Sequence, residues 1–146
     1  MPHVEKSALV PYSAADMFAL VDAVERYAEF LPWCGGTEQV NLSETVKLAT
    51  IHIDYRGIRQ SFTTENTRVG CEQMQMKLRD GPFSQLDGVW RFQALGEAAC
   101  KVSLALDYGF SNALLEKAVG PVFGMIASTM IERFVARADA IYGQSR

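Results

Sequence analysis

Groups that bind metals or carry out redox chemistry are scarce in this chain. Its 146 residues include three cysteines and two histidines. Cys34, Cys71 and Cys100 are odd in number, lie far apart and have no CxxC spacing. They provide neither a zinc framework nor a full set of disulfides, and they suit a reducing compartment. We therefore expect no metal site, no resident cofactor and a cytoplasmic location.

The chain also lacks a membrane span, a targeting signal and a nucleotide-binding motif. No continuous apolar run approaches the ~18 residues of a membrane span, and the N-terminus MPHVEKSALVPY does not combine a basic start with an apolar block. The segment GPVFG has neither the lysine of a P-loop nor the spacing of a dinucleotide fingerprint. These absences argue against integral membrane proteins, secreted proteins and nucleotide-dependent enzymes.

An excess of positive charge is missing as well. The net charge of −3 does not suit a protein that neutralises many phosphates, and we expect no DNA binding. The middle of the chain is locally basic, in a pattern typical of solvated strand faces, through Arg56, Arg59, Arg68, Lys77 and Arg79. This basic stretch is the only part of the chain that the residues themselves suit to phosphate contacts.

Apolar residues are plentiful, at 49% of the chain. A chain of this length is typical of one domain, and it should remove roughly 68–70% of its extended-chain surface from water. No internal repeat, low-complexity segment or linker interrupts the sequence. Residues 1–146 are therefore predicted to form a single domain with one sizeable core.

The apolar residues follow a helical period near the N-terminus and a strand period in the middle. Ser13 and Asp16 form a variant of the capping box before apolar residues at helical spacing, which predicts a helix over residues 14–27. Between Thr37 and Phe110 apolar and polar residues alternate, as in strands with one buried face. Short connections favour an antiparallel meander, and with a strand near residues 3–10 we expect about seven strands.

A second helix is predicted near the C-terminus. Pro121 is acceptable as a first helical residue, and Gly143 is a suitable stop. The segment 112–119 either forms a separate turn or lengthens this helix. Because a curved antiparallel sheet can wrap such a helix along its length, the predicted class is α+β, with one sheet gripping one long helix.

The segment FLPWC, residues 30–34, raises the question of thiol catalysis. A catalytic Cys34 would need a base within hydrogen-bonding reach. His3 lies at the chain terminus, and His52 alternates out of phase with the apolar residues of its strand. The acidic residues offer no evident catalytic pair. We therefore predict a packing role for Cys34 and no enzymatic activity.

The most apolar part of the expected sheet is DGPFSQLDGVWRFQAL, residues 80–95. One strand face there carries Leu86, Gly88, Trp90 and Phe92, and Phe83 lies at the turn. A glycine within a strand often marks a bend or the close approach of another group. Two interpretations stay open on the residues alone: ordinary core packing, or a cavity for an apolar ligand between this strand and the C-terminal helix.

Several segments, in order, resemble one known family. ERYAEFLPWC, DGPFSQLDGVWRF, LDYGFSNALL and GPVFGMIASTMIERFVARADAIYG are similar to the START-like coenzyme Q-binding and polyketide cyclase family in its short bacterial form. The resemblance implies a helix-grip fold, START-like or Bet v 1-like, in which a curved antiparallel sheet encloses a hydrophobic tunnel against a C-terminal helix. Two positions depart from the family pattern: Ala28 replaces a proline, and Gly109 replaces an acidic residue expected at the tunnel mouth.

The resemblance implies two binding functions; the family's cyclase names do not imply catalysis, and an enzyme is kept as a third interpretation. The preferred interpretation is non-enzymatic binding of ubiquinone or another isoprenoid lipid in support of respiratory electron transport, with transient contact to the inner-membrane surface. The alternative is a ribosome association toxin that binds the 50S subunit and blocks 70S formation. The third is an enzyme of the polyketide cyclase kind. Because each buried CH₂ group contributes roughly 0.8 kcal/mol, tail length should dominate the affinity for a lipid.

The candidate ligand-binding residues come from three places. The first group forms an apolar lip or gate, with the cysteine packed beneath it: Phe30, Leu31, Trp33 and Cys34. The second lies on the expected strands: Phe83, Leu86, Trp90, Phe92 and Tyr108. The third lies on the C-terminal helix: Phe123, Met130 and Phe134.

Overall fold

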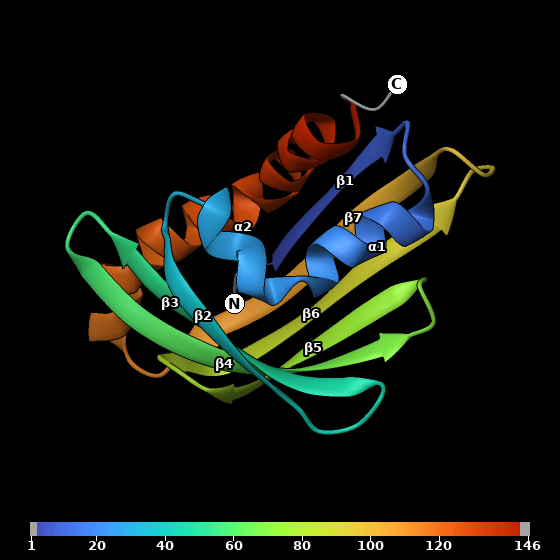
Figure 1. Ribbon diagram of the computed structural model, residues 1–146. Helices are drawn as coiled ribbons and strands as arrows, with labels where there is room; N and C mark the ends of the chain where they lie inside the picture. Colours follow the sequence, from blue (N-terminus) through green and yellow to red (C-terminus); the bar gives the residue numbers. More distant parts are fainter. Residues whose placement is uncertain (1–2, 144–146) are drawn as a thin grey trace.

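The computed structural model describes residues 3–143, in which one seven-stranded antiparallel sheet curves around one long helix (Figure 1). The strands are β1 (His3–Val10), β2 (Cys34–Asn41), β3 (Val46–Tyr55), β4 (Ile58–Val69), β5 (Gln73–Asp80), β6 (Phe83–Ala94) and β7 (Cys100–Phe110). The helices are α1 (Ala14–Asp22), the 3-10 helix η1 (Val24–Glu29) and α2 (Ala113–Tyr142). The predicted helix-grip α+β fold is confirmed.

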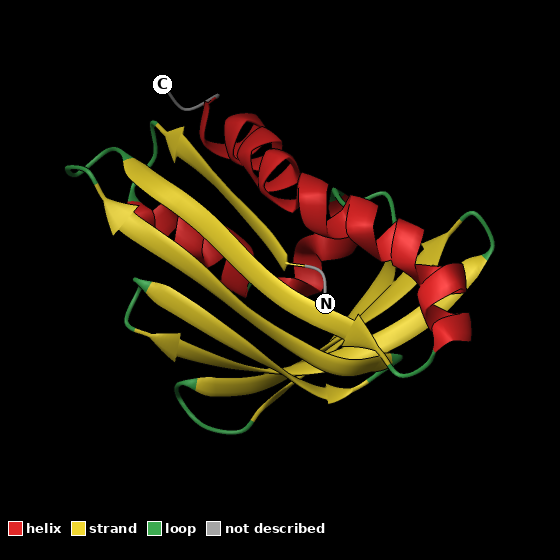
Figure 2. Cartoon of the chain, turned by 180° about the vertical axis from the view of Figure 1, so that it is seen from behind, coloured by secondary structure: helices red, strands yellow, loops and turns green. Residues whose placement is uncertain are grey.

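The strands are ordered β1-β7-β6-β5-β4-β3-β2, so only β1 departs from a simple meander. Figure 2 shows α2 lying along the inner, concave side of the sheet. Aromatic contacts place α1 and α2 on the same sheet face: Phe18 of α1 packs on Phe92 of β6, and Phe134 of α2 packs on Trp90 of β6. The core therefore lies between the inner sheet face and the helices.

The first helix ends earlier than predicted. Ser13 caps α1 as expected, with its Oγ accepting from the Asp16 N–H at 3.1 Å. The helix stops at Asp22, however, and a 3-10 helix follows Ala23. The hydroxyl of Tyr27 donates to a carbonyl in the last turn of α1, so a tertiary hydrogen bond replaces one that helix continuation would have supplied. Local spacing in the sequence does not reveal such a bond.

The second helix includes the segment whose structure the sequence left open. The Asn112 side chain accepts a hydrogen bond from the Leu115 N–H at 2.9 Å, which caps α2 at Ala113. Of the two alternatives left open by the sequence, the segment 112–119 thus lengthens the helix, and Pro121 lies inside α2. An asparagine oxygen satisfies one of the orphan N–H groups of a helix start, whereas proline only avoids one.

The end of α2 falls at Gly143, as predicted. Its 30 residues span about 45 Å. By length and composition alone α2 could also cross a membrane, a property that central helices of globular domains share. Here its inward side is buried against the sheet, through residues that include Phe123, Ile126 and Phe134.

Gly88 marks a close approach within the sheet, as the sequence indicated. It pairs with Met76 on β5 and with Leu106 on β7. A Cβ atom at residue 88 would lie 2.6 Å from Leu106 Cδ2 and 2.7 Å from Met76 Cε. Any larger residue at this position would therefore push these two side chains aside.

Candidate functional site

A cavity of about 50 Å³ lies between the inner sheet face and α2. Its walls come from η1, from strands β3 to β7 and from α2, and most of the lining side chains are apolar. No charged side chain from the described part of the chain lines it. The interior is therefore hollow, although its volume is well below the ~300–1,000 Å³ typical of ligand pockets.

Five of the predicted ligand-binding residues line this cavity. They are Leu86, Trp90, Phe123, Met130 and Phe134. Trp90 and Phe134 meet edge to face across the interior, with ring centroids 5.2 Å apart. Strand β6 and helix α2 thus face each other across the hollow, as the cavity interpretation of the sequence required.

Three other predicted residues lie in the layer behind the cavity wall. Phe83 and Tyr108 pack on Phe123, with ring centroids 4.8 and 4.7 Å away, and Phe92 stacks on Trp90 at 6.3 Å. These rings are buried and do not line the hollow. Their role in this conformation is to hold the lining aromatic side chains in place.

The FLPWC segment is part of the core rather than an exposed lip. Leu31 and Trp33 are each 1% exposed and Cys34 is 8% exposed, while Phe30 is partly open and Pro32 is exposed. The Asp54 N–H donates to the Trp33 carbonyl at 2.9 Å, which fixes the segment to β3. None of the four predicted residues lines the cavity, and the expected membrane-touching edge is absent at Leu31 and Trp33.

The Gly109 departure from the family pattern does not reach the cavity. Residue 109 pairs with Gln85, on the same outer sheet face as the pair formed by Asp87 and Asp107. Because side chains alternate along a strand, the buried Tyr108 points inward and a side chain at position 109 would point away. The expectation that this position contributes to the tunnel mouth is therefore wrong.

Cys34 has no catalytic base beside it. Burial raises the pKa of its thiol, which keeps the sulfur protonated at neutral pH, and its Sγ lies 3.5 Å from the Gly36 carbonyl oxygen. His52 belongs to the outer sheet face, where its ring nitrogens lie 2.6 Å from Ser61 Oγ and 2.9 Å from Glu38 Oε2. The thiol and the imidazole are thus on opposite faces of the sheet, as the alternation predicted.

Thiol reactivity is expected to follow burial. Cys71 is exposed, while Cys34 and Cys100 are buried and their thiol pKa values are raised by burial. An aromatic disulfide reagent at neutral pH should modify one thiol of the folded protein rapidly and the other two only after denaturation. The Cys71→Ser variant should lose the fast phase. Fast labelling that persists in this variant would show that Cys34 or Cys100 is accessible.

Two polar residues of the lining were missed at the level of sequence. Thr64 and Asn66 lie on the inner face of β4, two positions apart, and are buried. Phe62 precedes them on the same face. Because β4 reads as largely polar, its inner face was not recognised; the alternation from Phe62 was the signal that could have identified it.

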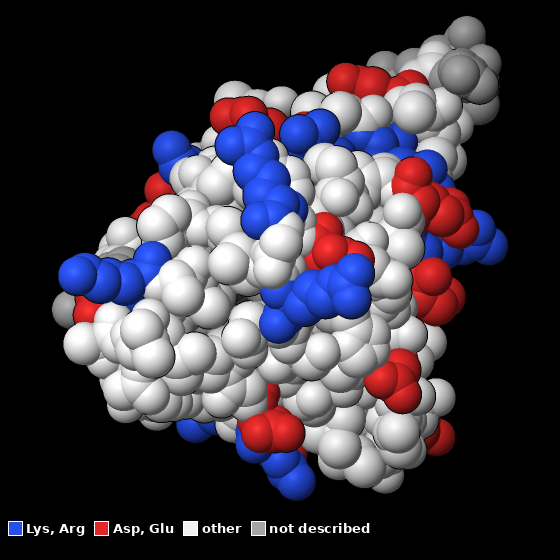
Figure 3. All heavy atoms as spheres, turned by 90° about the vertical axis from the view of Figure 1, so that its left-hand side faces the viewer, with Lys and Arg blue, Asp and Glu red and all other residues white. Residues whose placement is uncertain are grey.

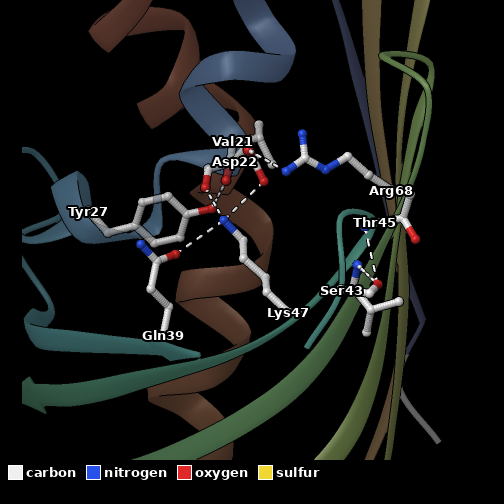
Figure 4. Close-up of polar contacts among 9 residues, drawn as sticks. Val21, Asp22, Tyr27, Gln39, Ser43, Thr45, Lys47 and Arg68 are labelled. Carbon is white, nitrogen blue, oxygen red and sulfur yellow. Dashed lines mark hydrogen bonds and ion pairs between the residues drawn. The ribbon is translucent and has the colours of Figure 1, made fainter. Parts of the chain in front are cut away.

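An ion pair between the buried Lys47 and the partly buried Asp22 lies next to these residues (Figure 4). Lys47 Nζ lies 3.0 Å from the Asp22 carboxylate and 3.2 Å from Gln39 Oε1, and it also donates to the Asp22 carbonyl. Arg68 approaches the same carboxylate at 3.8 Å. Figure 4 shows these contacts joining the end of α1 to strands β2, β3 and β4. The polar cluster thus anchors α1 to the sheet next to the cavity.

Comparison with known proteins gives the same picture at the level of the family. The model for "Polyketide cyclase / dehydrase and lipid transport" matches residues 10–135. The chain belongs to this family. The match extends from the end of β1 into the last turns of α2, so the matched region includes every wall of the cavity.

Proteins similar to this chain include some named for ribosome association and one named for coenzyme Q binding. The "Ribosome association toxin RatA" of Pseudomonas aeruginosa is 42% identical over 97% of this chain and 98% of its own length. The RatA of Vibrio cholerae is 43% identical over 99% of this chain and all of its own length. A distant relative, "Coenzyme Q-binding protein COQ10 homolog B, mitochondrial" of Xenopus laevis, is 22% identical over 95% of this chain and 59% of its own.

Among solved structures of the family's fold is the ZhuI aromatase/cyclase from a Streptomyces species. It superposes with a TM-score of 0.77 over 94% of this chain and 93% of its own, at 18% sequence identity. At this identity the likeness establishes a shared fold. An enzyme and proteins named for binding thus use the same architecture, and activity depends on the residues of each site.

Proposed function

We propose that this protein associates with the large ribosomal subunit and interferes with subunit joining, as a toxin of the RatA type. The observation that supports this most is the 42% and 43% identity to proteins named ribosome association toxins, over nearly the whole of both chains. Those relatives consist of little beyond this one domain. Ribosome association is thus ranked above lipid binding, whereas the sequence alone favoured lipid binding.

Basic residues on the surface are largely paired with or surrounded by acidic ones, so we expect a ribosome contact with few ionic interactions. In the basic stretch of the sequence, Arg59 pairs with Asp54 at 3.7 Å, and Arg79 pairs with Glu65 at 2.6 Å. The face in Figure 3 carries Lys and Arg interspersed with Asp and Glu on a largely uncharged surface. Neutralisation of many phosphates is therefore not expected.

Ribosome binding should consequently depend weakly on salt. One or two phosphate contacts would reduce the affinity by about tenfold or less between about 50 and 200 mM salt, whereas 6–10 contacts would reduce it by about 10³–10⁵. The measurement is co-sedimentation with purified 50S subunits over a salt series, with 30S subunits as the control. Failure to pellet with 50S at the lowest salt would remove the proposal, and a steep slope would contradict the argument from charge.

A second function, non-enzymatic binding of an isoprenoid quinone or similar lipid, is favoured by the cavity. Its apolar lining suits such a ligand, and one distant relative is named coenzyme Q-binding. The present volume of about 50 Å³ is too small for a quinone ring and its tail. Admission of a lipid would therefore require α2 or the α1–η1 segment to move outward. Such a protein would act in the cytoplasm with transient contact to the inner membrane.

Organic extraction of the purified protein, followed by mass spectrometry, tests this second function. A quinone or other isoprenoid lipid should be recovered in stoichiometric amount from wild type. The Gly88→Val variant should lose it, because the new side chain would push Met76 and Leu106 into the cavity. Ala105→Val adds bulk on the outer face of β7 and should retain the lipid. Repeated absence of lipid from wild type, with no uptake in titration, would count against the function.

A further inference from the structure

The cavity has one polar spot, made by Thr64 and Asn66 on β4. These residues are 4% and 6% exposed, and both line the hollow. The remaining lining residues are apolar, apart from Tyr27, whose hydroxyl donates to the Val21 carbonyl and is thereby occupied. Polarity is thus confined to one place on the wall.

The oxygen of the Asn66 side-chain amide is hydrogen-bonded, but within the described residues its NH₂ group is not. Thr64 Oγ1 donates to Asn66 Oδ1 at 2.6 Å, while the Asn66 NH₂ donates to no residue between positions 3 and 143. Trp33 Nε1 is the one fully sealed side-chain nitrogen or oxygen without a partner in this range. The Asn66 nitrogen is therefore not fully sealed, and Asn66 lies where the cavity meets a small polar pit. Buried polar groups are nearly always hydrogen-bonded, so a free donor in an apolar wall indicates a missing partner.

We propose that Thr64 and Asn66 form a head-group subsite for a neutral, mainly apolar ligand that carries a carbonyl or similar oxygen acceptor. This inference rests on the second proposed function, ligand binding in the cavity. The Asn66 NH₂ donates to the ligand oxygen, and the Thr64 hydroxyl holds the amide in place by donating to its oxygen. The apolar body of the ligand contacts the aromatic and aliphatic walls.

The charges nearby explain why the head group is neutral. Lys47 and Asp22 lie in a small polar pit that adjoins the cavity at Asn66. The Lys47 ammonium already donates to the Asp22 carboxylate, the Asp22 carbonyl and Gln39 Oε1. Its three protons are engaged, and Arg68, which also lines the pit, pairs with the same Asp22 carboxylate at 3.8 Å. A carboxylate placed against Asn66 would therefore be buried without a counter-charge of its own, which is costly.

The test compares three small ligands of similar size: acetophenone, which has the carbonyl; α-methylstyrene, which replaces its oxygen by CH₂; and benzoate, which is charged. Affinities are measured by NMR titration of the folded protein. Asn66→Leu should lower the affinity for acetophenone by about tenfold, the factor equivalent to one neutral hydrogen bond. The same substitution should change the affinity for α-methylstyrene by no more than about twofold. Benzoate should bind weakest to wild type.

Two controls separate the subsite from the cavity and from folding. Gln75→Leu makes the same kind of change on the outer face of β5 and should alter neither affinity. In wild type, acetophenone should shift the side-chain NH₂ resonances of Asn66 while α-methylstyrene does not, a readout that needs no variant. Equal weakening of both neutral ligands by Asn66→Leu, or no NH₂ shift, would overturn the subsite alone. Binding of neither ligand to wild type would overturn ligand binding together with it.

Discussion

Replacing Phe134 by alanine is expected to lower the free energy of unfolding by about 3–5 kcal/mol. Phe134 is fully buried, and its ring packs edge to face against Tyr27, Phe30 and Trp90, with centroids 5.4, 5.1 and 5.2 Å away. The substitution removes the ring that joins α2 to η1, FLPWC and β6. Since these aromatic neighbours also hold one another, the space left by the ring cannot collapse completely. Equilibrium denaturation in urea measures the change.

The matched control for Phe134→Ala is Leu114→Ala on the same helix. The Leu114 side chain is 77% exposed, and its loss should change the stability by less than about 0.5 kcal/mol. A loss below about 1.5 kcal/mol for Phe134→Ala would mean that this ring is not the junction between α2 and the walls that the contacts indicate.

The Asp22→Leu substitution should cost about 3 kcal/mol at neutral pH, because it leaves the Lys47 ammonium buried without a counter-charge. The Lys47 side chain is 11% exposed, and the Asp22 carboxylate is its one acidic partner in the described range. Removing one partner of a buried pair is usually worse than replacing both by apolar side chains. The Asp22→Leu/Lys47→Met double variant should therefore be more stable than the single variant.

The same denaturation experiment decides this second prediction. If Asp22→Leu has the same free energy of unfolding as wild type, the Lys47 ammonium must be hydrated by water once the carboxylate is removed. A double variant no better than the single would show that Asp22 acts through its place at the end of α1 rather than through charge. Either result would contradict the conclusion that the ion pair in this polar cluster fixes α1 beside the cavity.

The fold followed closely from periodicity, because alternation and helical spacing record which face of each element is buried. The helix ends were less predictable. The end of α1 depends on a hydrogen bond from Tyr27, and the start of α2 depends on Asn112 being a better cap than Pro121 is a first residue. Both helix ends are decided by hydrogen bonds, which the spacing of apolar residues does not reveal.

The cavity was predictable in outline and not in detail. Strand β6 and helix α2 supplied the expected lining residues, because large apolar side chains on facing elements must meet. The segment FLPWC was expected to form an exposed lip, yet Leu31 and Trp33 are core residues. Thr64 and Asn66 escaped notice because a polar residue on a strand is ordinarily assigned to the solvent face. Neither composition nor spacing gives the volume of the hollow.

The two proposed functions differ in what they require of this domain. Ribosome association would use its outer surface and would be compatible with a cavity of the present small volume. Lipid binding requires the same interior to open by several times its present volume of about 50 Å³. Ribosome assays of the Gly88→Val variant would separate these requirements, because its cavity should be filled while its outer surface is unchanged.

Subunit joining tests the central claim most directly. Purified 30S and 50S subunits are mixed under conditions that favour 70S formation, with increasing amounts of the protein, and are separated on a sucrose gradient. We expect the 70S peak to fall in proportion to the protein added, with the protein migrating in the 50S fraction. An undiminished 70S peak at molar excess, with all of the protein at the top of the gradient, would contradict the account.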